Sequence, residues 1–85
     1  MQQSRERSVM AEETPKVDLM YDGGTTGCGD LLIELSRVIR PLAQGSIVEL
    51  IALDPGAPED IPAWCRLRGY PLLSRKDHHY VFQKA

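Results

Sequence analysis

The sequence has little cysteine, no long apolar run and no cluster of basic residues, and each absence excludes a class of protein. Two cysteines occur in 85 residues, whereas a small secreted domain held together by disulfides normally carries more. No apolar stretch is long enough to span a membrane or to serve as the core of a signal peptide. The formal net charge is −2, so nucleic acid is not an expected partner. We expect a cytoplasmic protein with reduced thiols and no membrane contact.

The rest of the composition is that of one small folded domain. Hydrophobic residues make up 42% of the chain and charged residues 26%, which are ordinary values for a globular protein. Residues 1–16 are polar and charged, so they cannot bury enough apolar surface to offset the entropy lost on ordering. We therefore expect a disordered tail over residues 1–16 and a single domain over residues 17–85.

Hydrophobic periodicity predicts six elements in the order βαβαββ. Short apolar or alternating runs predict strands at residues 17–21, 47–53, 70–74 and 80–83. Apolar residues at helical spacing predict a first helix from Cys28 to a stop at Gly45, and a second from about Pro58 to Gly69. Two helices packed against four strands predict an α/β (α+β) two-layer sandwich.

Cys28 is the main candidate for a functional residue, because it opens the first predicted helix between Gly27 and Gly29. The first N–H groups of a helix are unpaired and carry partial positive charge, which stabilises a thiolate. Two flanking glycines leave the sulfur unshielded, whereas the carboxylate of Asp30 opposes a second negative charge. The residues alone leave two interpretations open: an accessible thiol with a lowered pKa, or a small buried apolar side chain.

The other candidate residues favour structural roles. Cys65 follows Trp64 on the apolar face of the second helix, and both are expected in the core. His78 and His79 are adjacent in a turn and lack a partner motif, so we expect no metal site. The glycine-rich residues 23–27 lack the lysine and the spacing of a phosphate loop. No cofactor is expected.

Several short segments in combination resemble the TusA/SirA family of small sulfur-carrier proteins over about residues 17–84. They are Asp22–Cys28, Gly45, Leu53–Pro55, Asp60–Cys65, Gly69–Leu73 and Tyr80–Phe82. The resemblance implies the fold of that family, a mixed four-stranded sheet with both helices on one face. It also implies that Cys28 accepts sulfane sulfur as a persulfide and hands it on. The family usually has Cys-Pro at this helix start, whereas this chain has Cys28-Gly29.

The resemblance and the residues together favour one function over two alternatives. We expect a sulfur carrier or sulfurtransferase that uses Cys28 as nucleophile, with Gly27, Gly29 and Asp30 supporting the helix start. Its partners are expected to be a protein sulfur donor, such as a cysteine desulfurase or a rhodanese, and an acceptor protein. The missing Cys-Pro motif motivates a first alternative, a non-catalytic interaction or regulatory module. RNA binding by analogy of fold is the second, and the acidic balance opposes it.

Overall fold

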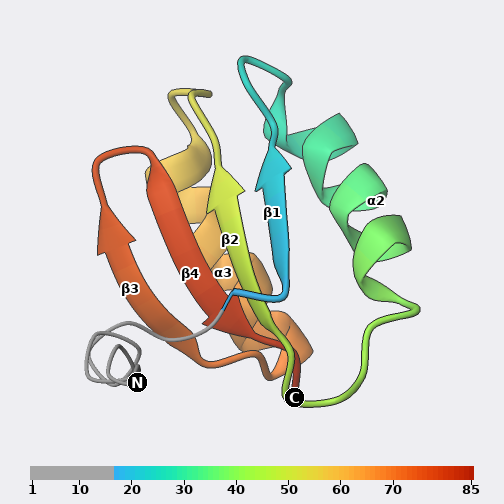
Figure 1. Ribbon diagram of the computed structural model, residues 1–85. Coiled ribbons are helices and arrows are strands. Elements are labelled where there is room, and N and C mark those ends of the chain that lie inside the picture. Colours follow the sequence, from blue (N-terminus) through green and yellow to red (C-terminus); the bar gives the residue numbers. More distant parts are fainter. Residues whose placement is uncertain (1–16) are drawn as a thin grey trace, which may run out of the picture.

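The computed structural model describes residues 17–85, which form two helices and one four-stranded sheet (Figure 1). In chain order the elements are β1 (Leu19–Asp22), α2 (Cys28–Ile39), β2 (Ile47–Ile51), α3 (Ala57–Arg68), β3 (Leu72–Lys76) and β4 (His79–Gln83). This is the predicted βαβαββ order. The predicted disorder of residues 1–16 lies outside the described residues.

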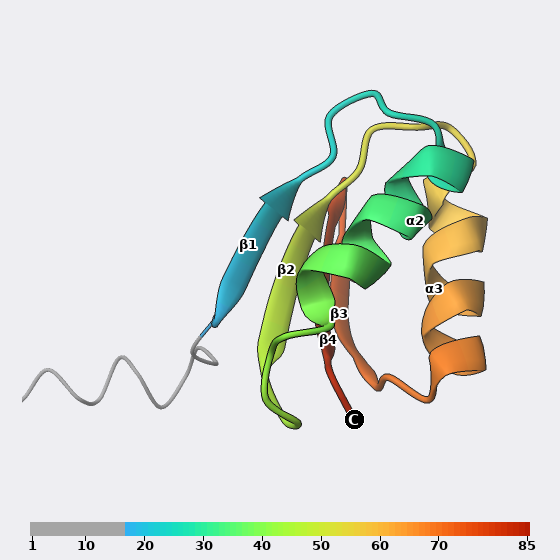
Figure 2. The ribbon, with the colours of Figure 1, turned by 90° about the vertical axis from the view of Figure 1, so that its right-hand side faces the viewer.

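The sheet is mixed, with the strand order β1-β2-β4-β3. Strands β1 and β2 run parallel, whereas β4 runs antiparallel to both of its neighbours, β2 and β3. Both helices lie on the same side of the sheet, as the side view in Figure 2 shows. The predicted two-layer sandwich is therefore confirmed, and so are the mixed sheet and the placing of both helices on one face. Within residues 17–85, neither helix is both long enough and apolar enough to cross a membrane.

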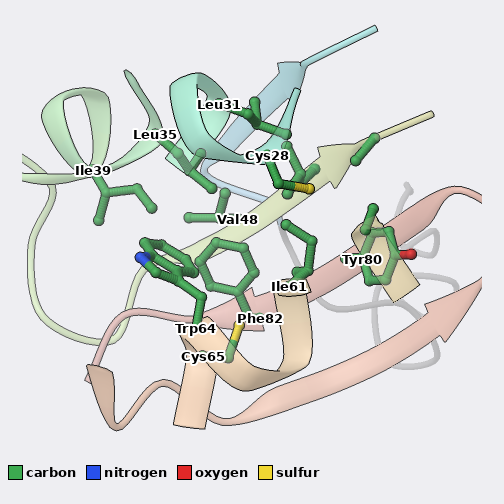
Figure 3. Packing of buried hydrophobic residues seen from close by; sticks show 13 residues of the cluster. Cys28, Leu31, Leu35, Ile39, Val48, Ile61, Trp64, Cys65, Tyr80 and Phe82 are labelled. Carbon is green, nitrogen blue, oxygen red and sulfur yellow. The ribbon is translucent and has the colours of Figure 1, made fainter. Parts of the chain in front are cut away.

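Helix α2 faces the sheet with a single stripe of buried side chains. The stripe consists of Cys28, Leu31, Leu35 and Ile39, none of which is more than 7% exposed. Their spacing of three or four residues places them on one face of the helix, and Figure 3 shows them directed toward the sheet. Burial of this stripe fixes the rotation of α2 about its own axis, and with it the direction in which its first side chain points.

Helix α2 ends at Ile39, which makes the predicted stop at Gly45 wrong. Pro41 has no N–H to continue the helical hydrogen bonds, so the chain leaves the helix before it. The ammonium group of Lys84, from beyond β4, donates hydrogen bonds to the last carbonyls, those of Ile39, Arg40 and Leu42, at 2.7–3.2 Å. A lysine distant in the sequence therefore supplies the hydrogen-bond donor that carbonyl groups at the end of a helix lack.

Helix α3 follows the prediction more closely. A proline stands in its first turn, and it ends at Gly69, whose φ of 75° is left-handed. The N–H of Tyr70 donates to the carbonyl of Cys65 at 2.8 Å, so Tyr70 completes the end of the helix and β3 begins later than predicted. Trp64 and Cys65 are 8% and 1% exposed, which confirms both as core residues.

An aromatic cluster anchors α3 to the sheet. The ring of Trp64 meets Tyr70 and Phe82 edge-on, with centroids 5.6 Å apart in each case. Tyr70 and Phe82 stack on each other at 5.9 Å. Since Phe82 belongs to β4 and is fully buried, this cluster joins the helix to a central strand of the sheet.

Candidate functional site

Two loops meet at the edge of the sheet where the parallel strands β1 and β2 end. The N–H of Gly23 donates to the carbonyl of Ile51 at 2.8 Å, and the N–H of Leu53 donates to the carbonyl of Gly24 at 2.9 Å. A Cβ atom on Gly23 would stand 2.7 Å from a methyl group of Leu31 and 3.0 Å from the Ile51 carbonyl, so this close approach requires glycine. Figure 2 shows both loops on the same side of the molecule, leading into the starts of α2 and α3.

Cys28 is the first residue of α2 and lies at this junction of loops. Its side chain is 7% exposed, and its thiol donates a hydrogen bond to Oδ2 of Asp54 at 3.3 Å. The interpretation of Cys28 as an accessible thiol is therefore wrong. Position 28 begins the stripe of α2 that packs against the sheet, so burying that stripe turns the sulfur inward (Figure 3).

Asp54 is held in place by the start of α3. Its Oδ2 accepts the N–H of Gly56 at 3.0 Å as well as the thiol of Cys28, and its carbonyl accepts the N–H of Ala57 at 2.9 Å. Asp60 comes from the first turn of α3, and its carboxylate, Asp54 and the Cys28 sulfur lie within 4.8 Å of one another. A Cβ atom on Gly56 would stand 3.0 Å from Oδ2 of Asp60 and 3.1 Å from Oδ2 of Asp54. The missing side chain at position 56 therefore gives both carboxylates room beside the thiol.

The surroundings of Cys28 keep its thiol neutral. Burial, followed by the hydrogen bond to Asp54 and the negative charges of Asp54 and Asp60, raises the pKa of Cys28 to about 12. The expectation of a lowered pKa is therefore wrong, because burial and the carboxylates of Asp54 and Asp60 favour the neutral thiol. Asp30, which we expected to be the opposing carboxylate, is exposed and is not among the groups that raise this pKa.

Gly27 and Gly29 stand on open surface on either side of Cys28. Both are exposed, and a Cβ atom at either position would meet no atom within 4 Å. Gly27 precedes the helix with extended backbone angles and provides no side chain to cap it, while Asp30 lies in the first turn, where a carboxylate interacts favourably with the helix dipole. The supporting roles of Gly27, Gly29 and Asp30 stay predictions.

Cys65 and the histidines take no part in this site. Burial raises the pKa of Cys65 to about 11, and both cysteines are free. Nδ1 of His79 lies 3.0 Å from Oε2 of Glu49 on the neighbouring strand β2. Among residues 17–85, Cys28, Asp54 and Asp60 are the one grouping whose spacing suits a metal ion. We assign no metal to it, because exposed carboxylates commonly approach one another without an ion.

Asp54 and Asp60 were not predicted to be neighbours of Cys28. One signal for Asp54 was present: it follows the second predicted strand, as the loop before Cys28 follows the first. Neighbouring parallel strands end at the same edge of a sheet, and side chains that follow such strands meet there. The position of Asp60 beside Cys28 depends on how α3 packs against the sheet, and no pattern in the sequence predicts it.

The site lies within a stretch that matches a known family. The profile of the family described as Sulfurtransferase TusA matches residues 27–83, a range that contains Cys28, Asp54 and Asp60. The sulfur carrier protein TusA of Pseudomonas putida is 32% identical over 73 residues, which cover 86% of this chain and 89% of the relative. Its namesake in Pseudomonas aeruginosa is 31% identical over 64 residues, covering 75% of this chain and 81% of the relative. The chain therefore belongs to the TusA family.

Proposed function

We propose that this protein is a sulfur carrier that holds a sulfane sulfur as a persulfide on Cys28. The observation that carries the proposal is the place of Cys28, which is the first residue of α2 at the junction of two loops. The relatives from both Pseudomonas species are named sulfur carrier proteins, which supports the same role for this chain. Protein partners, and the cytoplasm as the compartment where thiols stay reduced, are parts of this proposal.

The proposed loading step is a transfer of one sulfur atom between two cysteines. The Cys28 sulfur attacks the outer sulfur of a donor persulfide, a new Cys28 S–S bond forms, and the S–S bond of the donor breaks. The donor cysteine leaves with the electron pair of that bond and takes up a proton, while Cys28 gives up one, so nothing is oxidised or reduced overall. An acceptor cysteine then removes the outer sulfur from Cys28 in the same way. A cysteine desulfurase or a rhodanese is the proposed class of donor.

The buried and neutral state of Cys28 suits a carrier that reacts only with its partners. A thiol reacts as its thiolate, so a thiol with a raised pKa is protected from oxidants and electrophiles in solution. The exposed, unfilled surface at Gly27 and Gly29 is where a partner's backbone can approach the start of α2. Contact with the donor is the proposed event that makes the sulfur reachable.

The experiment is to incubate the protein with a cysteine desulfurase and cysteine, and then to measure its intact mass. We expect a gain of one sulfur atom, which a thiol reductant removes. Cys28→Ser should abolish the gain, because a hydroxyl group forms no persulfide. Cys65→Ser is the matched control and should retain the gain, since Cys65 is 1% exposed and lies toward the end of α3, away from the junction of loops at Cys28 (Figure 3). No gain with several desulfurases and rhodaneses, or a gain that persists in Cys28→Ser, contradicts the proposal.

A further inference from the structure

The Cys28 thiol, which is the proposed nucleophile of this protein, donates a hydrogen bond to the carboxylate of Asp54. The distance from Sγ to Oδ2 of Asp54 is 3.3 Å, an ordinary hydrogen-bond length for sulfur. Asp54 is half-buried and fixed by the N–H of Gly56, which donates to the same oxygen. Oδ2 of Asp54 therefore already accepts a hydrogen bond from the thiol whose S–H bond must break when the sulfur attacks.

On the basis of the proposed function, we infer that Asp54 is a second catalytic residue, which accepts the Cys28 proton as Sγ attacks the sulfane sulfur. The proton passes from Sγ to Oδ2 while the new S–S bond forms. The donor cysteine leaves as a thiolate and takes that proton from Asp54, so the carboxylate is regenerated. A base within hydrogen-bond reach of the proton it removes satisfies the geometric condition for general base catalysis.

The groups around the thiol single out Asp54 for this role. Asp60 faces the thiol from α3 but is exposed, and it contributes less than Asp54 to keeping the thiol neutral. Tyr80 approaches from β4, is buried in the core, and has a raised pKa, so it stays protonated at neutral pH and cannot accept a proton. Asp30, on the same helix as Cys28, is exposed and stands in the first turn.

Two reactions of the same thiol separate a proton acceptor from a residue that only keeps the thiol neutral. Alkylation by iodoacetamide follows the amount of free thiolate, so Asp54→Asn should speed alkylation of Cys28 at pH 8 by about tenfold or more, the effect of lowering a pKa by about one unit. Loading by a cysteine desulfurase that carries a persulfide, measured in a single turnover at saturating desulfurase and pH 7, should instead slow by about tenfold or more, because the acceptor of the proton is gone. Both rates are measured in the Cys65→Ser background, so that Cys28 alone reports.

Two further variants supply the controls. Asp60→Asn removes the same charge but leaves the acceptor in place, and it should speed both reactions. Asp54→Glu restores a carboxylate, and it should recover part of the loading rate that Asp54→Asn loses. If Asp54 were only a structural contact, a longer side chain at this position would not restore the rate. The asparagine at position 54 retains an oxygen for the N–H of Gly56, and circular dichroism checks the fold. If Asp54→Asn does not fold, Asp54→Ser carries the same comparison with a smaller acceptor.

The outcomes distinguish this inference from the proposed function. Faster alkylation combined with slower loading in Asp54→Asn supports the inference. Loading that is unchanged or faster in Asp54→Asn overturns it and leaves the carrier function standing, as does alkylation that is unchanged. Failure of the parent protein to take up sulfur from any donor overturns the proposed function, and with it the role of Asp54 as acceptor.

Discussion

Truncating Trp64 to alanine should remove most of the stability of the domain. Trp64 is 8% exposed and meets both Tyr70 and Phe82 edge-on at 5.6 Å, and the guanidinium group of Arg68 lies 5.5 Å from its ring centre. Truncating a buried tryptophan typically lowers the free energy of unfolding by about 3–5 kcal/mol. Each aromatic pair contributes about 0.5–1.5 kcal/mol beyond burial, which places Trp64→Ala toward the upper end of that range.

Urea unfolding followed by far-ultraviolet circular dichroism measures this loss, because the signal comes mainly from the backbone and not from tryptophan fluorescence. Small domains lie near the low end of about 5–15 kcal/mol in total stability. With a slope of about 1–2 kcal/mol per molar urea, the unfolding midpoint should fall by about 2–4 M, leaving a protein that is partly unfolded without denaturant.

Leu67 provides a matched control on the same helix. It is 84% exposed, so Leu67→Ala should change the free energy of unfolding by no more than about 0.5 kcal/mol. Trp64→Phe keeps an aromatic ring against Tyr70 and Phe82 and should lose less than Trp64→Ala. Equal midpoints for Trp64→Ala and Leu67→Ala would refute the reasoning, because they would mean that the aromatic cluster does not anchor α3.

Three further predictions concern the ends of the helices. Lys84→Met removes the three hydrogen bonds to carbonyls at the end of α2 and should lower the free energy of unfolding in urea by about 1–2 kcal/mol. Lys76→Met, on the exposed surface of β3, is the control and should lower it by less than about 0.5 kcal/mol. Equal losses in the two variants would contradict the role of Lys84 at the end of α2. Gly27→Ser adds a capping oxygen before α2 and should raise the melting temperature slightly. Gly69→Ala should lower the melting temperature, with a loss of about 1 kcal/mol in the free energy of unfolding, because a φ of 75° strains any residue with a Cβ atom. Shifts of the same sign in both variants would contradict this prediction. Gly29→Pro should fold with an unchanged circular dichroism spectrum, since the first turn of a helix needs no N–H at that position, and loss of helical signal would show that α2 starts elsewhere.

The sequence by itself determined the elements, their order and the core of α3. Periodicity is a local property, so the apolar stripes of both helices and the short apolar runs of the strands identify themselves without knowledge of their neighbours. Trp64 and Cys65 could be assigned to the core for this reason, and Gly69 could be assigned to the end of a helix. Family membership likewise followed from short segments in a fixed order.

Tertiary structure alone decided the chemical state of Cys28. The N–H groups of a helix start favour a thiolate, but Cys28 belongs to the buried stripe of α2, where loss of water favours the neutral thiol. The carboxylates that act on its thiol come from residues 54 and 60, which reach it because β1 and β2 are parallel and their loops end side by side. The end of α2 depends in the same way on Lys84. Contacts between distant residues are set by how elements pack, and local patterns do not contain that information, so the elements could be predicted while the electrostatics of the site could not.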